Sequence, residues 1–154
     1  MTLKEFGLTI AGFVQRLALG AVSGIVIASA AQAQVTAYKC DMKNYGRGYA
    51  NSDQMFLQLD QGKGVALVYD GLIANENDKK PVVAKYTMGS NGRYKLRYSV
   101  DVTYKNHTTG RADFIVTFFP GRNDLHLSAG FAGADNNGMG GRGKCKAVKP
   151  VEFK

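Results

Sequence analysis

The sequence predicts an all-β fold, a small antiparallel barrel or sandwich of eight strands preceded by a signal-peptide helix. Residues 94–105 alternate between apolar and polar side chains, which is the period of a strand. Seven further short segments rich in β-branched and aromatic residues repeat this pattern more weakly. After residue 33 no segment carries a convincing apolar stripe of helical period. Strands without crossover helices pair antiparallel, so a single sheet closed or folded on itself is expected.

The segment 94–105 is the strongest of the expected strands. A helix would scatter its apolar and polar sets around the circumference, whereas a strand separates them. One face holds Tyr94, Leu96, Tyr98, Val100, Val102 and Tyr104. The other expected strands cover residues 35–41, 54–60, 64–70, 82–88, 112–119, 124–131 and 143–148.

Tight and long connections alternate along the chain. The tight ones are 61–63, 89–93 and 120–123, and the long ones are 42–53, 71–81, 106–111 and 132–142. In an up-and-down topology alternate connections lie at opposite ends, so the long loops are expected to gather at one end. Loops on a rigid sheet often carry binding residues, and this end is the predicted functional mouth. The alternative is that the long loops are tolerated insertions.

The first 33 residues are predicted to be a cleaved signal peptide. Lys4 and Arg16 give a positive n-region, residues 17–28 form a short apolar run, and Ala31-Gln32-Ala33 is the cleavage site. The run is shorter than the roughly 20 residues that span a bilayer. We therefore expect one mature domain, residues 34–154, that is periplasmic or secreted and has no stable membrane span. An uncleaved anchor is the alternative.

The two cysteines, Cys40 and Cys145, lie near the two ends of the expected mature domain. In an oxidising compartment they predict one disulfide. We expect it to latch the first and last strands together at the long-loop end. A metal pair is the weaker interpretation, because neither His107 nor His126 stands at ligand spacing from a cysteine. No metal site and no cofactor are expected.

The charge balance predicts an anionic ligand or partner. The chain has a net charge of +8, and removing Lys4, Arg16 and Glu5 with the signal segment leaves +7. Such a domain attracts lipid phosphate, acidic glycans or acidic proteins. Nucleic acid is not the expected partner. The alternative is that the charge serves solubility alone.

The candidate ligand-binding residues follow the first expected strand and precede the last. Tyr45, Arg47 and Tyr49 combine aromatic faces with a guanidinium, and Arg142 and Lys144 add charge. They are predicted to line or rim the mouth of the barrel. The alternatives are a turn held by two tyrosines and a solvated basic end.

Other motifs give no catalytic residue. Residues 138–145 nearly match a phosphate-binding loop, but Cys145 replaces the hydroxyl residue that would hold magnesium. His126 is expected to point outward from its strand, and Ser128, two residues on, is sterically a poor nucleophile partner. An enzyme, most plausibly a hydrolase, is therefore the lesser alternative.

In its size, its early Tyr38-Lys39-Cys40 and its strand pattern, the chain resembles the small exported barrels with one disulfide. These include lipocalin-type carriers and the bacterial lysozyme inhibitors. The resemblance implies a lipocalin-like up-and-down barrel, and no residue role is transferred from it. We expect a non-enzymatic binding or inhibitor module for an anionic ligand. An eight-stranded outer-membrane barrel is the alternative, although only 94–105 clearly reaches the roughly 9–11 residues that such strands need.

Overall fold

The computed structural model describes residues 34–45, 52–104, 106–131 and 139–153. The chain divides into two units, Met1–Ala30 and Ala31–Lys154, and every described residue lies in the second. The expected signal peptide therefore lies outside the described residues. So do Arg47 and Tyr49 of the expected ligand site.

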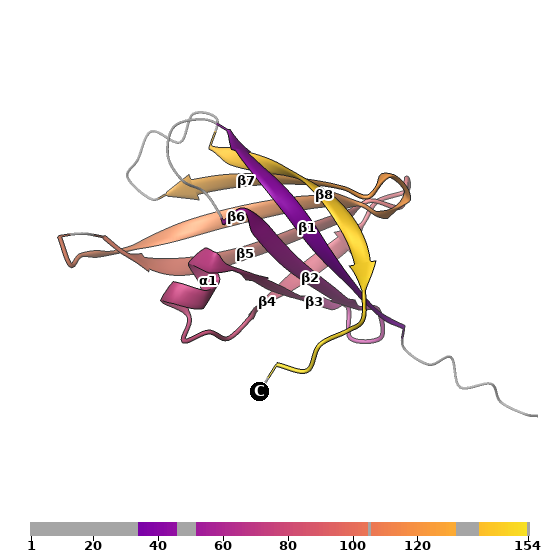
Figure 1. Cartoon of the computed structure of the whole chain (residues 1–154), viewed down its shortest axis with the longest axis horizontal. Coiled ribbons are helices and arrows are strands. Elements are labelled where there is room, and N and C mark those ends of the chain that lie inside the picture. The colour runs from indigo at the N-terminus through magenta and orange to yellow at the C-terminus, as the bar shows by residue number, and fades with distance from the viewer. Residues whose placement is uncertain (1–33, 46–51, 105, 132–138, 154) are drawn as a thin grey trace, which may run out of the picture. The chain divides into compact units, whose positions relative to one another are not determined.

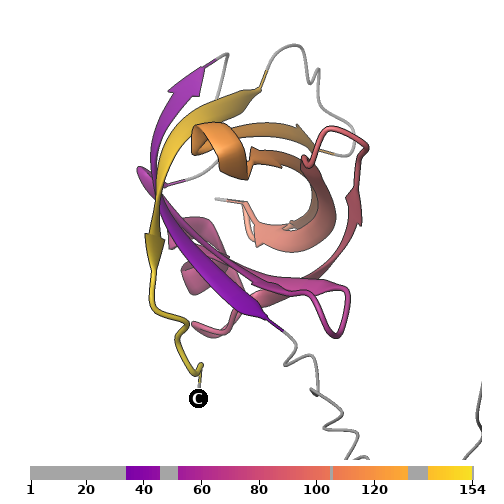
Figure 2. The same cartoon turned by 90° about the vertical axis from the view of Figure 1, so that its right-hand side faces the viewer.

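Eight antiparallel strands close into a barrel in sequence order (Figure 1). They are β1 (Val35–Tyr45), β2 (Gln54–Asp60), β3 (Val65–Asp70), β4 (Val82–Met88), β5 (Tyr94–Thr103), β6 (Thr109–Phe119), β7 (Asp124–Phe131) and β8 (Gly140–Val148). The predicted all-β, up-and-down fold is confirmed, and it is a barrel rather than a sandwich. Figure 2 shows the strands arranged as a ring.

Three strands extend beyond their expected bounds. The first runs on to Tyr45, the sixth begins at Thr109 and the eighth begins at Gly140. The extension of β1 and β8 has one cause: they pair over nine residues, from Ala37–Val148 to Tyr45–Gly140. Backbone pairing with β1 holds the glycines at the start of β8 in a strand despite their low strand propensity.

The expected loop 71–81 contains a short helix, α1 (Gly71–Glu76). Asp70 is its N-cap, and its carboxylate accepts a hydrogen bond from the backbone N–H of Ile73 at 2.9 Å. The Ile73 side chain is fully buried in the core. Six residues are too few for a helical period to be visible in the sequence. No helix among the described residues has the length and apolar character needed to cross a membrane.

The inside of the barrel is a packed core. The apolar face predicted for 94–105 is confirmed over Tyr94, Leu96, Tyr98 and Val100, which are buried. Val102 is half-buried, and Tyr104 lies beyond the end of β5 and is exposed. The largest fully buried side chains are Phe114, Phe118, Met55, Leu57, Leu59, Ile73, Leu96, Leu125, Leu127, Val68 and Val116. Because these residues fill the interior, the outer wall is the place to look for a ligand site.

The predicted disulfide between Cys40 and Cys145 is confirmed. The two residues stand directly opposite each other in β1 and β8, with their Cα atoms 3.9 Å apart, and both are buried. Its expected position at the long-loop end was wrong. The ladder continues past the bridge to Tyr45–Gly140, so the bond lies in the middle of the wall.

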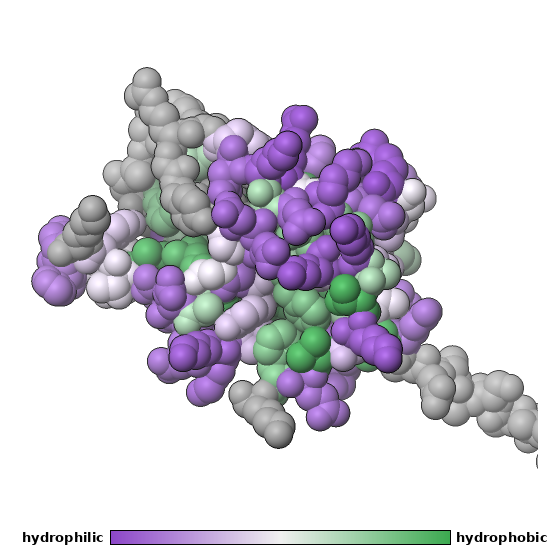
Figure 3. All heavy atoms as spheres, in the orientation of Figure 1, coloured by the Kyte–Doolittle hydropathy of each residue, from purple (hydrophilic) through white to green (hydrophobic). Residues whose placement is uncertain are grey.

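The C-terminal segment, residues 149–153, crosses the outside of β2 and β3. The backbone N–H of Val151 donates to Gln58 Oε1 at 2.9 Å. The ring of Phe153 lies 5.6 Å, centroid to centroid, from both Phe56 and Tyr69. In Figure 3 hydrophobic side chains gather in this lower part, whereas hydrophilic ones cover β1 and β8. The segment thus covers an apolar pair that the outer wall would otherwise expose.

Candidate functional site

A groove of about 790 Å³ lies on the outer wall where β1, β8 and β7 run side by side. Its lining is Asp41, Lys43, Asn44, Tyr45, Asp124, His126, Arg142, Gly143 and Lys144. The structure therefore brings together Tyr45, Arg142 and Lys144 of the expected ligand site. Arg47 and Tyr49 lie outside the described residues.

Strand alternation places these side chains on the outside of the barrel. Cys40 and Met42 are buried in the core, so Lys43 and Tyr45, which have the opposite parity on β1, face out. On β8 the buried Cys145 likewise leaves Arg142 and Lys144 exposed. Arg142 and Lys144 therefore lie on the outer wall of the barrel and do not line its inside, whereas Tyr45 ends β1 at the long-loop end.

The middle of the groove is a row of basic side chains across three strands. Arg142 stands directly between Lys43 on β1 and His126 on β7. Neighbouring strands are about 4.8 Å apart, so the three groups share one surface. Neither Lys43 nor Arg142 makes an ion pair within the described residues. Like charges directly opposite each other destabilise a sheet, which makes this row costly for the free protein.

His126 is turned outward as expected, and it is half-buried. Its ring meets the ring of Phe119 edge-on, at 5.5 Å between centroids. The register of β7 against β8 places His126 opposite Arg142. When protonated, His126 adds a third positive charge to the row.

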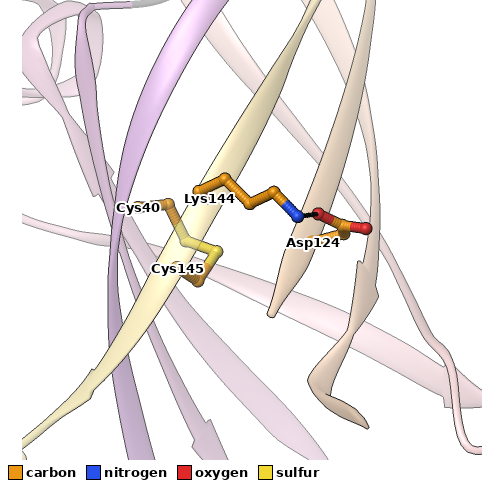
Figure 4. The surroundings of a disulfide bond; sticks show 4 residues. All are labelled: Cys40, Asp124, Lys144 and Cys145. Carbon is orange, nitrogen blue, oxygen red and sulfur yellow. Dashed lines mark ion pairs between the residues drawn. A yellow bond between two sulfur atoms is a disulfide. The ribbon is translucent and has the colours of Figure 1, made fainter. Parts of the chain in front are cut away.

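The next row toward the tight-turn end is balanced by carboxylates. Lys144 stands between Asp41 and Asp124, and its Nζ lies 2.6 Å from Asp124 Oδ1 (Figure 4). Arg122 Nε approaches the other oxygen of Asp124 at 3.7 Å. The hydrogen bond from Lys144 is the main cause that lowers the pKa of Asp124 below its ordinary value. Lys144 is thus already paired, which leaves Lys43 and Arg142 as the cations available to a ligand.

At the far end of the groove the ring of Tyr45 lies across Gly140. The Tyr45 hydroxyl donates to the backbone carbonyl of Leu127 at 3.3 Å. A Cβ atom at Gly140 would collide with that carbonyl and with the Tyr45 hydroxyl. Glycine at this position therefore lets the aromatic ring lie close to the strand, where it forms a flat end wall.

Sequence reasoning missed Lys43, Asp41 and Asp124 and gave His126 no binding role. A usable signal was present for Lys43. Once Cys40 and Cys145 are paired, three residues forward from one and three back from the other place Lys43 opposite Arg142.

His126 and Ser128 point outward from the same strand and make no hydrogen bond to each other. Among the residues that the structure describes, no three His, Cys, Asp or Glu side chains are grouped so as to hold a metal ion.

No protein-family model, curated protein or solved structure matches this chain. The function is therefore inferred from the chemistry of the groove. It offers two cations that have no carboxylate partner among the described residues, the imidazole of His126, and an aromatic wall.

Proposed function

We propose that the protein is an exported, non-enzymatic module that binds an anionic ligand in the groove formed by β1, β7 and β8. The observation that carries the proposal is the Lys43–Arg142 pair, two cations directly opposite each other without a carboxylate partner among the described residues. An anion bridging the pair would replace repulsion by attraction. The like-charged pair thus lowers the stability of the free protein, and a bound anion removes this destabilisation.

Each side chain has a distinct role in this proposal. The planar guanidinium of Arg142 can donate two parallel hydrogen bonds to a carboxylate, sulfate or phosphate. The ammonium of Lys43 adds a point charge beside it. The ring of Tyr45 gives a flat surface against which the apolar face of a ligand can pack. Lys144 holds the wall through Asp124 rather than contacting the ligand.

Two observations support export and a water-exposed barrel. A disulfide buried in the core is typical of proteins from oxidising compartments, which agrees with the periplasmic or secreted location expected from the N-terminal segment. The outward faces carry charges such as Lys85, Arg97 and Asp113, and the fully buried apolar side chains of the strands point inward. A membrane-spanning barrel has the reverse arrangement, which favours the binding module over that alternative.

Thermal unfolding of the full, oxidised protein with galacturonate, sulfate or phosphate tests the proposal. An anion that binds the folded state stabilises it by mass action, by about 2.7 kcal/mol at 100 times its Kd. Binding should therefore raise the Tm of the wild type, and Arg142→Gln and Lys43→Gln should each remove most of this increase. Without the anion, both variants should be as stable as the wild type or slightly more stable, because the repulsion is gone.

Lys63→Gln is the matched control, since Lys63 lies in the β2–β3 turn and pairs with Asp60. It should keep the full anion-dependent rise. The proposed function would be contradicted if an anion raised the Tm of both groove variants as much as that of the wild type. It would also be contradicted if none of the three anions raised the Tm of the wild type.

A further inference from the structure

The groove is one end of a longer basic surface. From Arg142 and His126 its row continues across Thr117 on β6 to Lys95 on β5. The adjacent row runs from Tyr45 across Gly140, Ser128 and Ile115 to Arg97 and Lys85. We call the six basic residues of these two rows the basic belt: Lys43, Arg142, His126, Lys95, Arg97 and Lys85. The belt winds over six of the eight strands, from β4 to β1.

No carboxylate stands in either row of the belt. Lys85 and Arg97 are directly opposite each other, a second like-charged pair of the kind seen in the groove. Both are exposed, and within the described part of the chain neither makes an ion pair. The feature that marks the groove is thus repeated four strands away around the barrel.

Carboxylates flank the belt on both sides. Asp124 lies in the row toward the tight turns and Asp113 in the row toward the long loops. Each is bound by its own cation, Asp124 by Lys144 and Asp113 by Arg111 at 3.5 Å. The flanking rows are therefore balanced, and the belt forms a track between them. They also separate the belt from a further like-charged pair, Lys39 opposite Lys146, which lies one row beyond Asp41 and Lys144 and makes no ion pair within the described residues.

The shape of this track selects the kind of ligand. Five steps of about 4.8 Å between strands give it a length of about 24 Å. Because it winds around a closed barrel, a flat membrane can touch only part of it, and a small anion can occupy only one like-charged pair. A flexible linear polyanion can follow its whole length. On the basis of the proposed function, we infer that the ligand of the groove is such a chain, running along the belt.

The side chains between the cations favour an acidic polysaccharide over a nucleic acid. The hydroxyls of Thr87, Thr117 and Ser128 face outward in the two rows and can bond to sugar hydroxyl or acidic groups. Apart from the imidazole of His126, Tyr45 is the single aromatic residue in the described rows, and it lies at one end. Single-stranded nucleic acids are bound by a succession of aromatic platforms on which the bases stack.

Calorimetric titration of the full, oxidised protein with galacturonate and with oligogalacturonates of increasing length tests this inference. Affinity should rise with length until the chain covers the belt. The double variant Lys85→Glu/Arg97→Glu should weaken binding of the longest oligomer by about tenfold or more and leave galacturonate binding unchanged. For the longest oligomer, the slope of log K against log salt concentration should be smaller in this double variant by about one for each cation lost.

Lys80→Glu/Lys149→Glu is the matched control, since it makes the same change in net charge at exposed positions outside the belt. An equal loss in this control would mean that net charge alone attracts the chain, and would overturn the belt. No loss in Lys85→Glu/Arg97→Glu at any length would overturn it too, while the groove could still bind the monomer. Unchanged galacturonate binding in Arg142→Gln would instead count against the proposed function.

Two further probes test the class of ligand. Oligothymidylate with the same number of charges and vesicles of phosphatidylglycerol should both bind more weakly than the long oligogalacturonate. Tighter binding of the oligonucleotide would overturn the assignment to a polysaccharide. Tighter binding of the vesicles would show that a planar lipid surface is the better partner.

Discussion

The wall where β8 meets β1 and the wall around β4, four strands away, are built differently. At the first wall nine residue pairs and a disulfide join the strands, and Lys144 is paired with Asp124. At the second, β4 pairs over only four residues with each neighbour, and Val83 and Met88 are 62% and 67% exposed. Both walls carry a like-charged pair on the outside, but only the first is held by a covalent bond.

The difference reflects the distance along the chain that each wall must close. The Cys40–Cys145 bridge joins residues 105 apart in sequence, so pairing β1 with β8 means closing the longest loop in the barrel. The β4–β5 turn spans only residues 89–93, and short loops are closed at a smaller entropic cost. A long ladder and a covalent bond are therefore needed at the first wall, whereas a short ladder is sufficient at the second.

The largest effect is expected at the first wall, on reduction of its disulfide. The chain-entropy model assigns about 4.7 kcal/mol to a bridge that closes a loop of about 100 residues. We expect the free energy of unfolding to fall by about that amount when urea denaturation is measured with and without dithiothreitol. Cys40→Ala/Cys145→Ala should behave like the reduced protein, with a further small loss from the cavity. An unchanged urea midpoint on reduction would show that the ladder alone closes the barrel.

A smaller effect is expected inside the opposite wall, at Tyr98. Its ring is stacked on Phe114 with 5.0 Å between centroids, and its hydroxyl has no hydrogen-bond partner among the described residues. Tyr98→Phe should therefore be neutral or stabilising by up to about 1 kcal/mol in urea denaturation. Tyr94→Phe is the control, because the Tyr94 hydroxyl accepts a bond from Gln61 at 3.4 Å and its loss should not stabilise. A clear destabilisation by Tyr98→Phe would mean that the hydroxyl has a partner.

The same residue predicts an alkaline limit. Burial is the main cause that raises the pKa of Tyr98 well above its ordinary 10.0, and the charge of Asp70 adds to it. The folded state then keeps the neutral phenol while the unfolded state loses its proton. Stability should therefore fall as the pH rises above 10, and less steeply in Tyr98→Phe.

The smallest effect is expected on the outside of the first wall, at Asp124. Its pKa is lowered from 3.8, so its contribution to stability is present above that pH and is lost as the pH falls through the native value. Lys144→Met should raise the Asp124 pKa toward 3.8, as measured by carboxyl NMR titration. Arg122→Met should raise it less, because Arg122 is farther away, at 3.7 Å rather than 2.6 Å. Equal shifts in the two variants would contradict the assigned cause.

Most of the strands could be predicted because the alternation of side chains is a local property. The limits of that approach are visible at β8 and α1. Gly140, Gly141 and Gly143 have low strand propensity, and they are in a strand because β1 and β7 pair with them. The helix α1 is too short to show a helical period, and its N-cap, Asp70, is also the last residue of β3.

The candidate site could be predicted only in part. Tyr45, Arg142 and Lys144 were found by residue type, but whether they face in or out depends on the parity that the disulfide imposes. That parity, and the position of Lys43 opposite Arg142, follow from counting along β1 and β8 from the bridge. The pairing of Lys144 with Asp124 depends on the register of β7 against β8, and no residue in the sequence marks that register.

The pairing of Ala37 with Val148 brings the start of β1 next to the end of β8. A short linker from the end of β8 to the start of β1 would therefore allow a circular permutant whose new ends lie in the 89–93 turn. In that rearranged chain Cys145 would shortly precede Cys40, so their bond would enclose only a small ring. The same disulfide, at the same place in the fold, would then contribute far less to the free energy of unfolding. Its contribution depends on how many residues separate the two cysteines along the chain, and the order of the strands sets that number.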